Sequence, residues 1–207
     1  MLEQAAERSI TSTEPGQTGE RALIAIQLRD GTMAELGPLL PEDGELMREG
    51  LSHMSEQSRF ARFGSGRSTL NEAEIQYLTD VDQVSHVAWG ATIDDQPAGV
   101  GRYIVGDDGR AEIAVTVVDE YQGRGLGRAL FDALVASARG SGIHRLWFSI
   151  QPWNRAVLRM MEGFAVSYDE EEGMLSGTVD VAAVPRGDRD DEYVALLDRY
   201  RQGWTSD

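Results

Sequence analysis

The stretch AEIAVTVVDEYQGRGLGR, Ala111 to Arg128, decides the fold and the candidate site. It begins with an apolar run rich in β-branched residues, Ile113 to Val118, which predicts a buried strand. The glycine-rich segment Gln122 to Gly127 follows, and a helical pattern begins directly after it. Glycine lets a backbone approach a ligand closely, and the first N–H groups of a helix have no partner within the helix. With the charges of Arg124 and Arg128, this junction predicts a site for a phosphate or pyrophosphate.

Two common phosphate-binding motifs fit this segment poorly. The dinucleotide fingerprint GxGxxG would need a glycine where Arg128 stands, and a P-loop needs a lysine, of which this chain has none. An ordinary glycine-rich connection between a strand and a helix is the alternative interpretation of the residues alone.

Composition limits the functional classes. The 207 residues are 41% hydrophobic and 26% charged, as in a soluble globular domain. A net charge of -16 argues against non-specific binding to nucleic acid and suits a cationic substrate, although it also fits a generally acidic surface. There is no cysteine, and His53, His86 and His144 match no metal-ligand spacing, so we expect neither disulfides nor a metal.

The chain shows no apolar run long enough to span a membrane and no apolar segment near its first residue, so a cytoplasmic location is expected. Three segments follow from the pattern. Residues 1–20 are polar and aperiodic and predict a disordered tail, residues 21–184 form the main domain, and residues 185–207 are a polar segment with a short helix at 191–201.

Periodicity and turn residues predict the elements of the main domain. The predicted strands cover residues 22–28, 87–93, 98–105, 111–118, 146–150, 164–168 and 174–184. One helix is predicted to begin at residue 41, and a short one has its cap and start within 69–74 and runs to 78. Two further helices are predicted at 126–138 and 155–161. A hairpin turn is expected at 94–97 and an acidic loop at 169–173.

Three features at compatible spacing carry a resemblance to a known family. They are Q-x-x-G-x-G after an apolar strand, Asn154 at the start of a helix, and Gly163-Phe164. Together with the order of elements over 21–184, they resemble the GNAT superfamily, the GCN5-related N-acetyltransferases. The segment SEQSRFARF, Ser55 to Phe63, resembles bacterial protein-acetyltransferase domains. The resemblance implies an α/β (α+β) fold with a mostly antiparallel mixed sheet, helices on both faces and a splayed strand that binds acyl-CoA.

The resemblance also implies acetyl-CoA as the acyl donor and assigns residues to it. Main-chain groups of Val115, Thr116 and Val117 would pair with the pantetheine arm. Asn154 would contact the pantetheine region, although asparagine is also a preferred helix cap. The turn would hold the pyrophosphate, and its residues are Gln122, Gly123, Arg124, Gly125, Leu126, Gly127 and Arg128.

The candidate general base is Glu112. Many family members have a glutamate five residues before the asparagine, but this chain has Ser149 there. Glu112 lies at the head of the motif strand, on the same face as Ala114 and Thr116, where apolar neighbours are expected to desolvate it in part. The alternative is an exposed glutamate at a strand end.

The family's usual general acid, a tyrosine seven residues after the asparagine, is missing. Met161 occupies that position, and alignment back from Gly163-Phe164 gives Arg159 instead. Water or Tyr168 would then protonate the CoA thiolate, or no dedicated acid is needed.

The sequence therefore predicts an acetyl-CoA-dependent N-acetyltransferase that acts on a protein lysine or a small cationic amine, as a monomer or homodimer. Two alternatives remain open. The first is a CoA-binding sensor or partner protein without catalysis, and the second is a nucleotide-binding protein that uses the glycine-rich turn. The acceptor is not defined by the sequence.

Overall fold

A computed structural model describes residues 21–64 and 68–204, and its centre is an eight-stranded sheet. The strand order is β1-β2-β3-β4-β5-β6-β8-β7, and every neighbouring pair is antiparallel except β5 and β6. The mostly antiparallel mixed sheet predicted from the sequence is confirmed. The strands are β1 Ile24–Gln27, β2 Met33–Pro38, β3 His86–Ile93, β4 Gln96–Val105, β5 Ala111–Val117, β6 Arg145–Ile150, β7 Val166–Glu171 and β8 Met174–Asp180.

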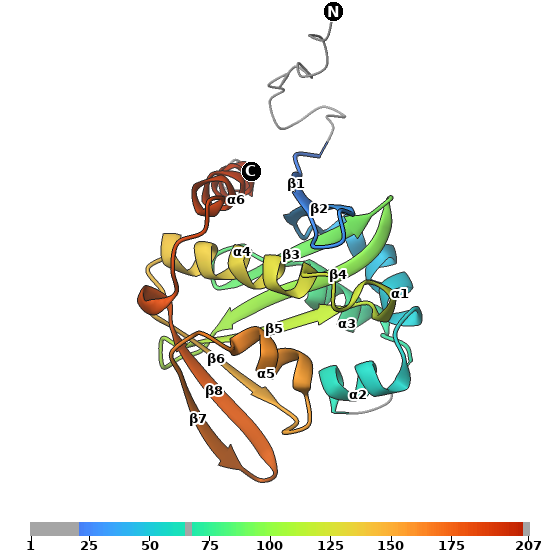
Figure 1. Ribbon diagram of the computed structural model, residues 1–207. Coiled ribbons are helices and arrows are strands. Elements are labelled where there is room, and N and C mark those ends of the chain that lie inside the picture. Colours follow the sequence, from blue (N-terminus) through green and yellow to red (C-terminus); the bar gives the residue numbers. More distant parts are fainter. Residues whose placement is uncertain (1–20, 65–67, 205–207) are drawn as a thin grey trace, which may run out of the picture.

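Helices cover both faces of this sheet, as predicted (Figure 1). Helix α4 lies across the front, with α6 above it, whereas α1 and α3 lie behind the sheet. The helices are α1 Gly44–Ser52, α2 Glu56–Phe63, α3 Glu72–Thr79, α4 Leu126–Gly140, α5 Arg155–Met161 and α6 Asp190–Trp204. Short 3₁₀ segments are η1 Pro41–Asp43, η2 Asp119–Tyr121 and η3 Val181–Ala183.

Close packing of α4 on the sheet holds the main core together. Leu130 and Leu134 of this helix are fully buried. At Gly101 of β4, an added Cβ would lie 2.9 Å from Leu134 Cδ1, so the absence of a side chain there lets the helix approach the strand. The buried Trp89 of β3 donates a hydrogen bond from Nε1 to Ser137 Oγ of α4 at 3.0 Å. These contacts fix the helix that carries the glycine-rich turn.

Two hairpins differ in detail from the sequence prediction. Between β3 and β4 only Asp94 and Asp95 form the turn, both with positive φ (49° and 62°), and β4 already begins at Gln96. The acidic loop predicted at 169–173 is wrong, because β7 and β8 stay paired as far as Glu171 and Met174. Since β7 is an edge strand, the side chains of Asp169 and Glu170 reach water without leaving the sheet.

Strand β2 was not predicted. Its sequence MAELGP contains glycine and proline, which are weak strand formers, yet it pairs with β1 on one side and β3 on the other. Tertiary pairing here overrides local propensity.

The C-terminal segment packs more tightly than expected. Helix α6 forms and is longer than predicted, and it buries Tyr193, Leu196 and Leu197 in the same core as α4. A boundary at residue 184 therefore does not separate this helix from the core. The predicted disordered tail at 1–20 lies outside the described residues. In the described part of the chain, no helix is both long and apolar enough to cross a membrane.

Candidate active site

The central feature of the site is a split in the sheet beside β5. Strands β4 and β5 pair along seven register positions, from Gly99 and Val117 to Val105 and Ala111. On its other edge, β5 pairs with β6 at only two positions, Ala111 with Leu146 and Glu112 with Trp147. Beyond Glu112 the two parallel strands diverge. The splayed strand expected from the sequence is confirmed, and its open edge leaves backbone groups free for a ligand.

The glycine-rich turn lies at the end of the open edge, directly before α4. Gly123 and Gly125 have φ values of 76° and 101°, which glycine adopts without strain. The carbonyl of Gly125 accepts the N–H groups of Arg128 and Ala129. Within the described residues, no hydrogen bond uses the backbone N–H groups of residues 123–127. These N–H groups, together with the positive end of the helix dipole, form an anion site.

Three arginines surround this anion site, and only two were predicted. Arg124 Nη1 lies 3.4 Å from Asp30 Oδ2, and Arg128 Nε donates to Asp132 Oδ1 at 2.8 Å. The third is Arg29, whose backbone N–H donates to Arg124 O at 2.9 Å. Its side chain lies 3.4 Å from the position of a Cβ on Gly125. The Asp30-Gly31 turn pattern did not predict that Arg29 lies at this site, because Arg29 and Arg124 are 95 residues apart in the sequence.

Gln122 connects the turn to two other elements. Its Nε2 donates to Val117 O at 3.0 Å and to Ser58 Oγ of α2 at 3.3 Å. Ser55 and Ser58 in turn donate to the Asp119 carboxylate, with Oγ···Oδ1 distances of 2.6 and 2.9 Å. These hydrogen bonds join α2 to η2 and to the glycine-rich turn that follows β5.

Asp119 is a poor substitute for a general base. Burial alone would raise the pKa of this carboxyl group, but hydrogen bonds from Ser55 and Ser58 outweigh that effect and hold the pKa below its usual value. A carboxylate that is stabilised in this way has little tendency to take a proton.

The side chains of the predicted pantetheine strand point to opposite faces. Val115 and Val117 face α4, where both lie within 4 Å of a Cβ position on Gly127. Thr116 faces the opposite side and lines a cavity under α1. The predicted contact of this strand with a cofactor through its main chain stays a prediction.

Asn154 serves as a helix cap. Its Oδ1 accepts the N–H of Val157 at 3.3 Å, at the start of α5. Its side chain is half-buried. This observation supports the capping role and leaves the contact with a cofactor as a prediction.

Glu112 lies at the vertex of the split, in the last residue pair that joins β5 to β6. Its side chain is exposed, so the expected partial desolvation is wrong. The reason is that β6 turns away immediately after this pair, which leaves water on the carboxylate. Burial lowers the pKa of the Arg62 guanidinium of α2, and the Glu112 carboxylate opposes that shift, so the two charges influence each other.

The positions at which the family commonly has its tyrosine acid and its glutamate base hold neither group in this chain. Met161 is 3% exposed and belongs to the main core, and Ser149 is an exposed residue of β6. Tyr168 lies on β7, at the far edge of the sheet, where its ring packs edge-on against Phe148 with 6.3 Å between centroids. Among the described residues, no group of three or more His, Asp or Glu side chains could hold a metal ion.

The fold and the site together define an α/β domain with a split sheet and an anion-binding turn at the mouth of the split. Comparison with known proteins supplies the family. Residues 51–165 match the acetyltransferase (GNAT) family, and the chain belongs to it. The prediction of an N-acetyltransferase of this superfamily is confirmed at the level of family.

Three relatives illustrate the similarity. Acetyltransferase Pat of Mycolicibacterium smegmatis is 34% identical over 172 residues, which are 78% of this chain and 50% of that protein. Acetyltransferase PA5475 of Pseudomonas aeruginosa is 30% identical over 63% of this chain and 73% of that protein. The GNAT domain of S. lividans PAT superposes with a TM-score of 0.72 at 28% identity, covering 76% of this chain and 96% of that domain. The chain spans about half the length of the Mycolicibacterium protein.

Proposed function

We propose that this chain is an acetyl-CoA-dependent N-acetyltransferase that moves an acetyl group to a primary amine. One observation carries the proposal: the open edge of β5 runs from the glycine-rich turn to Glu112. From Val117 to Glu112 the strand rises about 17 Å. A cofactor with its pyrophosphate at the turn would lay its pantetheine arm along this edge and direct its thioester toward the carboxylate.

The reaction needs positioning more than covalent help. The amine nitrogen attacks the thioester carbonyl carbon, an N–C bond forms, and the C–S bond breaks to release CoA thiolate. A free backbone N–H of β5 would polarise the carbonyl oxygen. Glu112 would take the proton that the amine loses, directly or through water. Because Met161 is buried and cannot donate a proton, water would protonate the thiolate.

The proposed acceptor is a protein lysine or a small cationic amine. The net charge of -16 would attract either one. Support for a protein lysine comes from the segment Ser55 to Phe63, which resembles bacterial protein-acetyltransferase domains.

A second candidate is a CoA-binding protein without catalysis. Its support is the serine at position 149 and the buried Met161, which together remove two groups that the family commonly uses. The exposure of Glu112 adds to this support.

One experiment separates the candidates. Release of CoA thiol from acetyl-CoA is measured over a panel of small amines and lysine peptides, and binding of acetyl-CoA, ATP and NAD is titrated in parallel. Amine-dependent thiol release supports the enzyme. Tight binding of acetyl-CoA without release with any amine supports the non-catalytic protein, and preference for ATP or NAD would refute both.

A further inference from the structure

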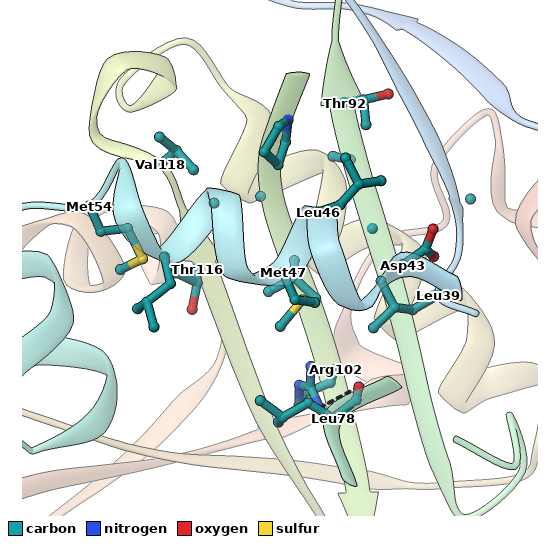
Figure 2. Close-up of a pocket in the computed structure, with 18 of the residues that line it drawn as sticks. Leu39, Asp43, Leu46, Met47, Met54, Leu78, Thr92, Arg102, Thr116 and Val118 are labelled. Carbon is teal, nitrogen blue, oxygen red and sulfur yellow. Dashed lines mark hydrogen bonds between the residues drawn. The ribbon is translucent and has the colours of Figure 1, made fainter. Parts of the chain in front are cut away.

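A partly open, mostly apolar cavity lies behind the sheet, on the side opposite α4. It has a volume of about 240 Å³ and lies between α1 and the strands (Figure 2). Most of its lining is aliphatic or thioether side chains, which include Leu39, Leu46, Met47, Met54 and Leu78. Methionine adapts its shape readily, so such a lining suits a small aliphatic group.

A buried arginine lines this apolar cavity. Arg102 of β4 is only 4% exposed. Its Nη1 donates to Leu78 O at 3.2 Å, and Figure 2 shows both residues together at one edge of the cavity. Nη1 also lies 3.3 Å from His86 Nε2, which must accept because a guanidinium only donates. Nε has no hydrogen-bond partner among the residues that the structure describes.

The Arg102 guanidinium has no counter-ion within the described part of the chain. None of the ion pairs there includes it, and its main charged neighbour is another cation, Arg62. Burial and then the charge of Arg62 lower the pKa of Arg102 to about 9. Burial and then the Arg102 charge lower the pKa of His86 to about 4, so His86 is neutral at pH 7. A buried charge is costly unless it is paired, so this site lacks an anion.

The acidic residues that line the cavity do not supply that anion. Asp43 is paired with Arg21 at 2.6 Å and also accepts the N–H of Leu40. Glu35 and Asp95 are exposed at the rim. A cationic inner surface is therefore built into a protein whose net charge is -16.

The cavity adjoins the strand proposed to hold the cofactor. Arg102 lies opposite Ala114 in the β4–β5 register. Thr116 lines the same cavity, and its buried hydroxyl has no hydrogen-bond partner in residues 21–64 and 68–204. Residues that alternate on one strand share a face, so Glu112, Ala114 and Thr116 point to this side of the sheet. Glu112 thus lies on the same face of the sheet as the cavity that Arg102 lines.

We infer that this cavity binds a short aliphatic chain that ends in a carboxylate, which pairs with the Arg102 guanidinium. Arginine presents a fork of N–H donors that matches a carboxylate, and the apolar walls exclude water from the pair. The source of the chain rests on the proposed function, because it is either the acyl group of the CoA donor or a part of the acceptor beside its amine. A purely apolar chain would leave the guanidinium unpaired.

The first test measures binding without any reaction. Calorimetry compares hexanoate with hexanol on the wild type, on Arg102→Met and on Arg48→Met as the matched control. Arg48 lies on the outer side of α1 and pairs with Glu45 and Glu72. Arg48→Met therefore removes one arginine charge at a position away from the cavity. We expect hexanoate to bind the wild type and the control at least tenfold tighter than hexanol, and this preference to vanish in Arg102→Met.

Equal affinity for hexanoate and hexanol in the wild type overturns the inference. So does a carboxylate preference that survives in Arg102→Met. Circular dichroism melting of each variant checks that the fold is intact, and Thr116→Val gives a second variant that keeps volume and removes only the hydroxyl. A severalfold loss of hexanoate affinity in Thr116→Val is expected, since a buried hydrogen-bond partner is removed.

The second test identifies the source of the carboxylate. In the donor arm, kcat/KM is compared for succinyl-CoA and butyryl-CoA, which differ at the end of the acyl chain. In the acceptor arm, acetyl-CoA is used with 6-aminohexanoate and with hexylamine. A preference of at least tenfold for the carboxylate in one arm, lost in Arg102→Met, supports the inference and names the source.

The two tests separate the inference from the proposed function. Measurable turnover without a carboxylate preference in either arm overturns the inference and leaves the proposed function standing. Absence of acyl-CoA binding and turnover refutes the proposed function, while calorimetry with hexanoate still decides the inference.

Discussion

The two edges of β5 meet their neighbours in opposite ways. On one side the strand is paired with β4 at seven register positions, and on the other it is paired with β6 at only two. The same seven residues therefore contribute to the core along one edge and leave the backbone open along the other. The difference arises beyond the strand itself, because nothing in the sequence of β5 distinguishes its edges.

Packing explains why one edge is sealed. Gly99 and Gly101 of β4 leave room for Leu130 and Leu134 of α4, which hold the β4–β5 pair flat against the helix. The other edge is open beyond Glu112, and α5, which follows β6, lies in front of the strands near the split (Figure 1). Changes at the sealed edge should therefore cost stability, whereas changes at the open edge should cost activity or cofactor affinity.

The largest expected effect lies at the vertex of the open edge. Glu112→Gln keeps the shape of the side chain but cannot take a proton. Loss of a positioned general base typically costs 10² to 10⁴ in rate, at least about 100-fold, so kcat should fall by that order. Acetyl-CoA affinity, measured by calorimetry, should stay within about threefold because the cofactor contacts are unchanged.

The control for this change is Glu120→Gln. Glu120 is an exposed glutamate of η2 between the strand and the turn, and its side chain enters no proposed step. Near-normal kcat in Glu112→Gln with an unchanged pH–rate profile would show that another group accepts the proton.

The sequence predicted those parts of the site that depend on neighbouring residues and missed those that depend on distant segments. The strand, turn and helix of 111–128 and the cap at Asn154 rest on neighbouring residues, and both were predicted. Arg29, the anchoring of α2 by Asp119 and the exposure of Glu112 depend on contacts between distant segments. No local pattern carries them. Strand β2 was missed for the same reason, since its pairing partners, rather than its sequence, make it a strand.

The next effect lies at the mouth of the open edge. Gly125→Val places a β-branched side chain at a φ of 101° and crowds Arg29, whose side chain lies 3.4 Å from the Cβ position. Approach of a pyrophosphate to the backbone should be blocked, and acetyl-CoA affinity should fall by well over tenfold, about 1.4 kcal/mol or more. Calorimetry measures this change.

The matched control for Gly125 is Gly142→Val. Gly142 has a φ of 71° with open space around it, and it lies after the opposite end of α4. Valine at position 142 would therefore introduce strain from a positive φ at a position away from the anion site. An equal loss of affinity in both variants would assign the effect to instability of α4.

A smaller effect is expected at the sealed edge. Gly101→Ala brings a Cβ to 2.9 Å from Leu134 Cδ1 and 3.3 Å from Leu130 Cβ. Overpacking of this kind costs about 1 kcal/mol of unfolding free energy, which urea denaturation measures. In the control, Gly50→Ala in α1, the added Cβ would lie 3.4 Å from Pro97 and 3.9 Å from Val118, which are ordinary van der Waals distances. Its stability should be unchanged or higher because alanine favours helices. An unchanged midpoint in Gly101→Ala would show that α4 adjusts without cost.

The smallest effect is expected at Tyr168, which tests whether a general acid has moved to the far end of the sheet. Strands β8 and β6 separate β7 from the open edge of β5, and the tyrosine ring packs against Phe148. Burial raises the pKa of Tyr168 above its ordinary value near 10, so its phenol stays protonated across the working range. If Tyr168 were the acid, the rate would fall only above that raised pKa, where the phenol loses its proton. We therefore expect Tyr168→Phe to change kcat by less than about twofold and to leave the pH–rate profile unaltered. A descending limb at high pH that disappears in Tyr168→Phe would instead place β7 over the split during turnover, and the separation between the two edges of β5 would then hold only in the free protein.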